Sequence, residues 1–156
     1  MSTLSEDKKK PDDPEELSLS WDWHVRRKVA WSSEASEKIL EQLSRDSSQW
    51  VREAVAGNAR TPAAVPARLA GDSSGFVRAA VALNGRASAG ILDLLAGDEM
   101  TDYDSTLQKN RYLVKEAAAK SPHIDPATLD FLARDPDEHV PPAAASNPPL
   151  PPAAMS

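Results

Sequence analysis

The sequence predicts an all-α fold, a solenoid of about five stacked helical repeats. Similar octapeptides begin 26 residues apart at Val25, Val51 and Val77, and further copies begin at Val114 and Val140. The step from Val77 to Val114 is 37 residues, one period plus an insertion of 11. Self-similarity at a period of about 20 to 50 residues is typical of repeat arrays, because one unit cannot bury its apolar face alone.

Composition narrows the class of protein. The net charge is −6, with 18 basic and 24 acidic residues, which disfavours binding to a nucleic-acid backbone. The chain has no cysteine, so it cannot build a disulfide, a thiolate metal site or an iron–sulfur cluster. No apolar run reaches the roughly 18–20 residues that span a bilayer, and residues 1–10 lack the apolar stretch of a secretory signal. We therefore expect a soluble, cytoplasmic protein.

The chain divides into a short tail and one repeat domain. Residues 1–10 are polar, and we expect them to be disordered. The helical repeat domain is predicted over 11–156, beginning with a helix start at Asp13-Pro14.

The unit at 47–72 gives the pattern within a repeat. Apolar residues at i, i+3 and i+4 from Val51 predict a first helix. Asn58, which tolerates a positive φ, is expected to end it. Thr61 and Pro62 suit the N-cap and first position of a second, shorter helix.

Equivalent positions of the units hold residues of similar size, which predicts core stripes shared along the array. One stripe is large and apolar: Leu43, Leu69, Leu95 and Leu132. Another is small: Ala30, Ala56, Ala82, Ala119 and Ala145. Alternating large and small stripes allow neighbouring helices to interdigitate.

The order V-R-x-A-V-A-x-N, then T-P, then L-x-x-L-A-x-D resembles the leucine-rich repeat variant family, a relative of HEAT-type helical repeats, over roughly residues 11–155. The resemblance implies a right-handed superhelix in which an α-helix alternates with a shorter, sometimes 3₁₀, helix. It brings no catalytic residue. One branch of the family carries a cysteine-ligated iron–sulfur cluster, which this cysteine-free chain cannot hold.

The insertion at 99–109 interrupts the period. Asp104 is expected to cap a longer first helix in the fourth unit. Insertions in repeat arrays often lie on the binding face, so Asp102 and Tyr103, with Tyr112 nearby, are candidate contacts for a basic partner. A tolerated surface loop is the alternative.

Aspartates and arginines recur six residues apart, as Asp46–Arg52 and Asp72–Arg78. We interpret them as a structural ladder in which each arginine bridges to an aspartate of its own or the adjacent unit. The alternative is a basic stripe for phosphates, made of one equivalent residue per unit: Arg26, Arg52, Arg78 and Lys115.

All four tryptophans lie in the first third of the chain: Trp21, Trp23, Trp31 and Trp50. Trp31 is expected to face solvent and is a candidate anchor for a partner; an N-terminal cap is the alternative use of the cluster. His24 and His139 share a repeat position with Trp50, so we expect them to pack between units. We find no catalytic constellation, metal-ligand spacing or cofactor motif.

The last repeat, 136–156, is degenerate and rich in proline. Its segment NPPLPP (147–152) suits either a polyproline ligand of SH3-like domains or a remnant of the repeat. Terminal repeats usually need a polar capping face, so we expect a partner subunit or a second copy of the chain to cover this end.

The sequence thus predicts a non-enzymatic scaffold or adaptor that binds another protein. The alternatives are a HEAT-like nucleic-acid binder that uses the Arg26 to Lys115 column, and an accessory subunit or chaperone of an enzyme. No cofactor, metal or membrane association is expected.

Overall fold

The computed structural model describes residues 12–106 and 109–147. Over these residues the fold is all-α, apart from one two-stranded hairpin. The predicted disordered tail at 1–10 and most of the NPPLPP segment lie outside the described residues.

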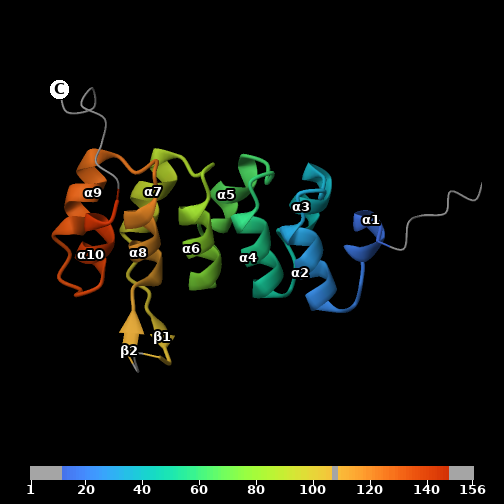
Figure 1. Ribbon diagram of the computed structural model, residues 1–156, viewed down its shortest axis with the longest axis horizontal. Coiled ribbons are helices and arrows are strands. Elements are labelled where there is room, and N and C mark those ends of the chain that lie inside the picture. Colours follow the sequence, from blue (N-terminus) through green and yellow to red (C-terminus); the bar gives the residue numbers. More distant parts are fainter. Residues whose placement is uncertain (1–11, 107–108, 148–156) are drawn as a thin grey trace, which may run out of the picture.

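The helices form two rows (Figure 1). The front row holds the helices of the recurring octapeptides: α2 (Trp23–Trp31), α4 (Gln49–Gly57), α6 (Gly75–Leu83), α8 (Leu113–Lys120) and α10 (Val140–Ala145). The second row holds α3 (Glu37–Leu43), α5 (Ala64–Leu69), α7 (Ala89–Ala96) and α9 (Pro126–Ala133), and the short α1 (Pro14–Leu17) contacts α2. Each front-row helix contacts the next one along the chain, and each helix from α3 to α9 in the second row contacts the two front-row helices beside it.

One continuous core runs between the rows. Val51, Val77, Val114 and Val140 have no exposed surface, whereas Val25 in the first helix of the front row is half-buried. The leucine stripe from Leu43 to Leu132 lies in the same cluster. The leucine stripe and the alanine stripe from Ala30 to Ala119 are therefore buried together, whereas Ala145 at the last position is exposed.

The second helices begin at polar caps. Ser36 and Ser88 each accept a hydrogen bond from the backbone N–H three residues on, at 3.2 Å, and Asp125 does the same at 2.9 Å. The predicted N-cap at Thr61 is wrong, because α5 begins at Ala64. The Thr61 side chain is instead fully buried, and its hydroxyl donates to the Val55 carbonyl at 2.6 Å.

The end of α4 lies at the predicted residue, but the expected reason was wrong. Asn58 has φ −77° and ψ 126°, which is extended backbone and not the left-handed conformation. The helix stops there because the asparagine side chain bonds to the neighbouring unit, as described below.

The insertion forms an antiparallel hairpin of β1 (Asp102–Asp104) and β2 (Lys109–Arg111), with Tyr103 opposite Asn110. The expected elongated helix capped by Asp104 is therefore wrong, and α8 begins only at Leu113. A hairpin pairs much of its own backbone, so the insertion can project beyond the end of α8 without disturbing the rows (Figure 1).

Candidate protein-docking surfaces

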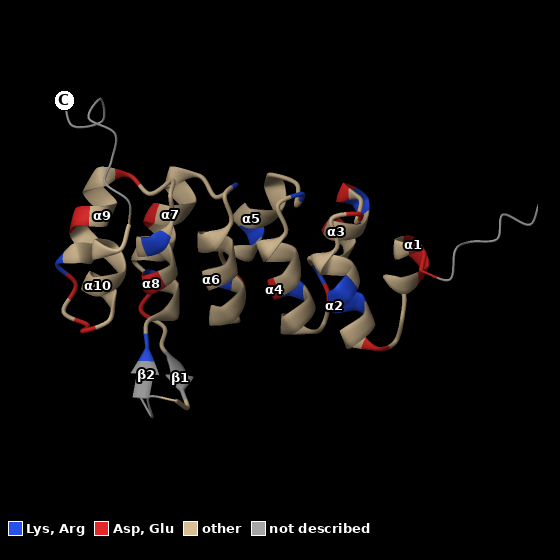
Figure 2. Cartoon of the chain, viewed as in Figure 1, with Lys and Arg blue, Asp and Glu red and all other residues tan. Residues whose placement is uncertain are grey.

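A ladder of ion pairs joins successive helices of the front row. Arg26 Nε lies 2.6 Å from Asp46, Arg52 Nε lies 2.8 Å from Asp72, and Arg78 Nε lies 2.7 Å from Asp98. Lys115 Nζ continues the series, 3.0 Å from Asp135. Every partner is 20 residues further along the chain. The basic residues recur along the front row in Figure 2.

An arginine and the aspartate six residues before it meet through the backbone carbonyl of the aspartate. Arg52 Nη1 donates to the backbone carbonyl of Asp46 at 2.8 Å, and Arg78 Nη1 donates to that of Asp72 at 2.6 Å. Each arginine therefore binds the main chain of its own unit and the carboxylate of the next. The hydrogen bond to Asp72 raises the pKa of Arg52, and the bond to Asp46 does the same for the pKa of Arg26.

The ladder leaves these cations little surface for other ligands. The side chains of Arg26 and Arg52 are 15% and 17% exposed, and those of Arg78 and Lys115 are 5% exposed. Burial lowers the pKa of Lys115, but the hydrogen bonds that Lys115 donates to Glu99 and Asp135 outweigh burial, so the pKa is raised. These four basic side chains therefore connect neighbouring helices of the fold.

A second ladder, of asparagines, was missed in the sequence. Asn58 Nδ2 donates to the carbonyls of Ala30 at 2.7 Å and Ser32 at 3.0 Å. Asn84 repeats the contact on Ala56 and Asn58, and Asn147 repeats it on Ala119 and Ser121. These carbonyls lie at the end of the preceding front-row helix, where the last C=O groups have no partner within the helix. Those of Ser32, Asn58 and Ser121 also accept a backbone N–H from the turn that follows. The asparagine that ends three of the octapeptides was the feature of the sequence that could have predicted this ladder.

An apolar groove lies on the front row, and we call it the α2–α6 groove. It has a volume of about 320 Å³. The residues that line it include Trp31, Glu53, Gly57, Phe76, Ala79 and Leu83. Three of these side chains are large, apolar and open to solvent: Trp31 is 50% exposed, Phe76 38% and Leu83 55%.

The groove depends on the absence of a side chain at Gly57. Trp31, Gly57 and Leu83 are equivalent positions of three successive units. A Cβ placed on Gly57 would lie 2.9 Å from Cη2 of Trp31, closer than such atoms approach. The indole of Trp31 therefore lies against the backbone of Gly57, and any side chain at this position would displace the ring from the wall of the groove.

The edges of the groove differ in chemistry. Trp50 and Phe76 are in contact, with ring centroids 5.5 Å apart, and extend the apolar surface along the row. Glu53 lies at the wall and is partly buried; burial raises its pKa, although the charge of Arg27 opposes this. The arrangement offers apolar contact beside a carboxylate that is incompletely solvated.

The other predicted contact residues lie elsewhere. Tyr112 is the N-cap residue of α8, and Lys115 Nζ lies 4.7 Å from its ring centroid. Asp102 and Tyr103 belong to β1, and their side chains are outside what the structure describes. The hairpin meets the front row at α8, so these residues do not join Trp31 in one site (Figure 1).

The expected roles of some N-terminal residues were wrong. His24 does not pack between units; its side chain is 66% exposed, stacks on Trp23 and bonds to Asp22 at 2.9 Å. Trp21 is 93% exposed and shields nothing. Trp23 packs partly against the core. The position of α2 explains this, because within residues 12–106 and 109–147 it is the first helix of the front row.

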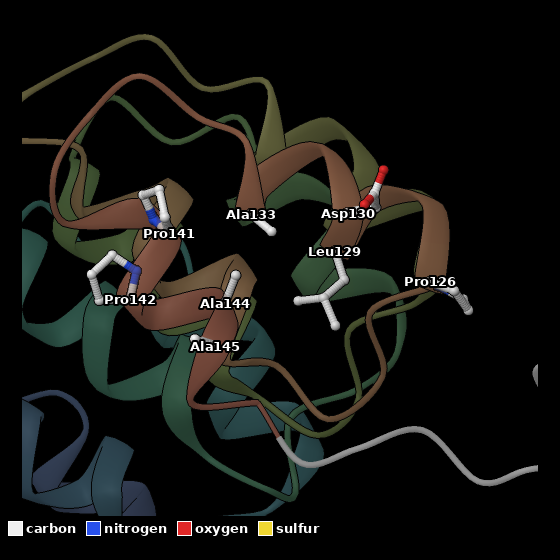
Figure 3. A pocket seen from close by; sticks show the side chains of 8 residues that line it. All are labelled: Pro126, Leu129, Asp130, Ala133, Pro141, Pro142, Ala144 and Ala145. Atoms are coloured by element: carbon white, nitrogen blue, oxygen red, sulfur yellow. The ribbon is translucent and has the colours of Figure 1, made fainter.

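A second apolar hollow, of about 650 Å³, lies at the C-terminal end between α9 and α10 (Figure 3). Leu129 and Ala133 line it from α9, and Pro141, Ala144 and Ala145 line it from α10. We call it the terminal hollow. Its lining is almost entirely apolar, with Asp130 at one side.

Among the residues that the structure describes, no helix has the length and apolar character needed to cross a bilayer. The same residues contain no group of three acidic, histidine or cysteine side chains placed to bind a metal ion. A comparison with known proteins finds no family model, no curated protein and no solved structure that matches the chain.

Proposed function

We propose that this chain is a right-handed helical repeat solenoid of the leucine-rich repeat variant kind, with about five units of 26 residues. Bonds that recur in step with the repeat support the proposal: the four ion pairs of the ladder each span 20 residues, and the asparagine bonds span 26 and 28. Contacts of this regularity arise when successive units meet in the same way.

We further propose that the chain is a non-enzymatic scaffold that binds another protein through the α2–α6 groove. The observation that carries this is the exposure of Trp31, Phe76 and Leu83 around one hollow. Contiguous exposed apolar surface of this kind marks interaction sites, and tryptophan is enriched among the residues that dominate binding energy.

The chemistry of the groove indicates what it would bind. An apolar side chain of the partner would lie against the exposed side chains of Trp31, Phe76 and Leu83. A donor group beside it would meet the Glu53 carboxylate, whose partial burial leaves it short of water. We therefore propose a protein segment with an apolar anchor next to a lysine, an arginine or another hydrogen-bond donor.

The ladder weighs against the nucleic-acid alternative. A phosphate-binding stripe needs cations that can exchange their counterions, whereas Arg26, Arg52, Arg78 and Lys115 already hold carboxylates. An adaptor within a larger enzyme assembly would use the same groove and is a version of the present proposal.

The proposal is tested with the purified chain as bait. A partner captured from native lysate is identified, and its Kd is measured for the wild type and for Trp31→Ala. We expect at least a tenfold weaker Kd, which corresponds to about 1.4 kcal/mol or more, with little change in Tm.

The matched control is Leu94→Ala, because Leu94 is 64% exposed but lies in the second row on α7. Its Kd should equal that of the wild type. If Trp31→Ala and Leu94→Ala bind alike, the partner does not use the groove.

A further inference from the structure

One asparagine of the ladder lies in a chemically reactive dipeptide. The chain has four asparagines, and Asn84 is the one that a glycine follows. The backbone nitrogen after an asparagine can attack the side-chain amide, and glycine permits this most readily because it has no side chain to obstruct the approach. The other two asparagines of the ladder are less reactive. Asn58 precedes an alanine, and Asn147 precedes a proline, whose nitrogen carries no hydrogen.

The fold does not require a glycine after Asn84. Gly85 is exposed, and its φ lies outside the left-handed region. A Cβ placed on Gly85 would lie 3.9 Å from Nε2 of His123, which is an ordinary van der Waals contact. Neither packing nor backbone conformation therefore explains the glycine, and its consequence at this position is chemical.

The folded structure protects the Asn84 amide in two ways. Its Nδ2 donates to the carbonyls of Ala56 at 2.6 Å and Asn58 at 3.1 Å, and its Oδ1 accepts the backbone N–H of Arg86 at 3.0 Å. The backbone at Asn84 has ψ 127°, which turns the nitrogen of Gly85 away from the asparagine side chain. Attack on the amide carbon therefore requires this turn to open.

We propose that Asn84 is a site of hydrolytic deamidation that is protected in the folded array and reacts when the turn after α6 opens. In the open state the Gly85 nitrogen loses its proton and bonds to Cγ of Asn84. The bond from Cγ to Nδ2 then breaks, and ammonia leaves. Water opens the resulting cyclic imide, so an amide and water become a carboxylate and ammonium. The product is an aspartate or its β-linked isomer.

The reaction runs in one direction and removes a contact between units. An aspartate has no N–H to donate, so it would direct a charge at the carbonyls of Ala56 and Asn58, which Asn84 binds. Repeat arrays open locally as well as globally, and each opening that ends in reaction leaves a permanent change. The proposal rests on the contacts of Asn84 and not on the function of the α2–α6 groove.

The experiment follows deamidation of the purified chain by peptide mapping with mass spectrometry, in mildly alkaline buffer and in the same buffer with denaturing urea. In urea, Asn84 should react faster than Asn58, the internal reference. In buffer alone, Asn84 should react at least about tenfold more slowly than in urea, because only the open fraction reacts. Equal rates of Asn84 loss in the two conditions would overturn the proposal, as would equal loss of Asn84 and Asn58 in urea.

Gly85→Ala is the matched variant for the chemistry. Because the fold has room for the added Cβ, its Tm should stay within about 2 °C of the wild type. In urea its Asn84 should react at about the rate of Asn58, since both asparagines then precede an alanine. If Asn84 of the variant reacts as fast as in the wild type, the glycine does not control the reaction and the assignment fails.

A stability measurement tests the consequence of the reaction. Asn84→Asp reproduces one product and should lower Tm by about 4 °C or more, because a buried carboxylate replaces the amide that donates two hydrogen bonds. The control, Gln42→Glu, makes the same change of amide to acid on an exposed residue, and its Tm should stay within about 1 °C of the wild type. Equal Tm values for the two variants would contradict a permanent loss of the contact. Neither experiment involves Trp31, so failure of this proposal leaves the groove proposal untouched.

Discussion

Glu53 brings a carboxylate into the wall of an apolar groove, where water only partly reaches it. Burial raises the pKa of this group above its ordinary value of 4.5, and the charge of Arg27 offsets part of the effect. A side chain that is easier to protonate in the folded state than in the unfolded state reduces stability when it is ionised. The stability of the folded protein therefore depends on pH through Glu53.

Replacing Glu53 by glutamine should stabilise the protein at pH 7. The folded state binds the proton more tightly than the unfolded state, so the wild type loses stability as pH rises above about 4.5 through the folded pKa. The Tm difference between Glu53→Gln and the wild type should be positive at pH 7 and should shrink towards pH 4, as measured by thermal unfolding.

Glu41 provides a control of opposite sign. A hydrogen bond from Arg68 lowers its pKa below 4.5, so its contribution is present above that pH and is lost as pH falls. Glu41→Gln should therefore be slightly less stable than the wild type at pH 7, with the difference closing in acid. A pH-independent Tm shift for Glu53→Gln would mean that the carboxylate is not desolvated.

The sequence predicted the exposure of some single residues and not of others. Trp31 was expected to face solvent because its repeat position holds dissimilar residues in other units, among them Gly57 and Leu83. Phe76 shares the repeat position of Trp50, which predicts packing between units, yet Phe76 is 38% exposed. Exposure depends on which side of a helix the next unit leaves open, and a column of residue types does not contain that information.

At the scale of elements, the ion-pair ladder joins α2, α4, α6 and the segments that follow them. Each aspartate of the ladder also accepts a backbone N–H of its own turn, as Asp72 does from Ser74 at 2.9 Å. Asp46 and Asp72 bind the N-cap residues of α4 and α6 in this way, so each of these carboxylates fixes the start of a helix and attaches it to the preceding front-row helix. Such pairs set the spacing between units as well as their stability.

Asp72→Asn should lower the free energy of unfolding by roughly 2–3 kcal/mol, because it leaves the Arg52 guanidinium, which is 17% exposed, without a carboxylate. Chemical denaturation measures the change. Arg134→Ala is the control: it removes an exposed i,i+4 pair with Asp130 and should cost less than about 0.5 kcal/mol. Equal losses for the two variants would show that the ladder does not stabilise the rows.

The elements themselves were partly predictable. The end of α4 at Asn58 follows from the repeat, but its cause is the pair of bonds to Ala30 and Ser32 in the neighbouring unit. The start of α5 was misplaced because Thr61 has an alternative acceptor inside the structure. Local capping rules fail where a polar side chain finds a better partner in the tertiary fold.

At the scale of the whole molecule, the hairpin interrupts the repeat in the chain without interrupting the front row in space. Although it separates α6 from α8 in the sequence, these two helices contact each other as α4 and α6 do. Arg111 at the base of β2 bonds to Glu116 on α8, which holds the return of the chain.

Deleting residues 100–110 should leave the fold intact, because it restores a 26-residue step between Val77 and Val114 and keeps Arg111 and Glu116. The far-ultraviolet circular dichroism should retain its helical shape, and Tm should change by only a few degrees. A matched control deletes the 11 residues 64–74, which removes α5 and should abolish cooperative unfolding. Loss of folding in both deletions would show that the hairpin is structural.

The sequence by itself determined the helical class, the period of 26 residues, the positions of the buried stripes and the place of the insertion. These properties depend on which residue types recur at which intervals, and a linear pattern records that directly. The tertiary structure decided the form of the insertion, the partners of the arginines, the asparagine ladder and the groove around Gly57. The two ladders depend on contacts between groups 20 or more residues apart, and the groove depends on surface left uncovered when helices meet. The insertion is a hairpin because the backbones of Asp102–Asp104 and Lys109–Arg111 pair with each other. These contacts are set by distances in space that the repeat spacing does not specify.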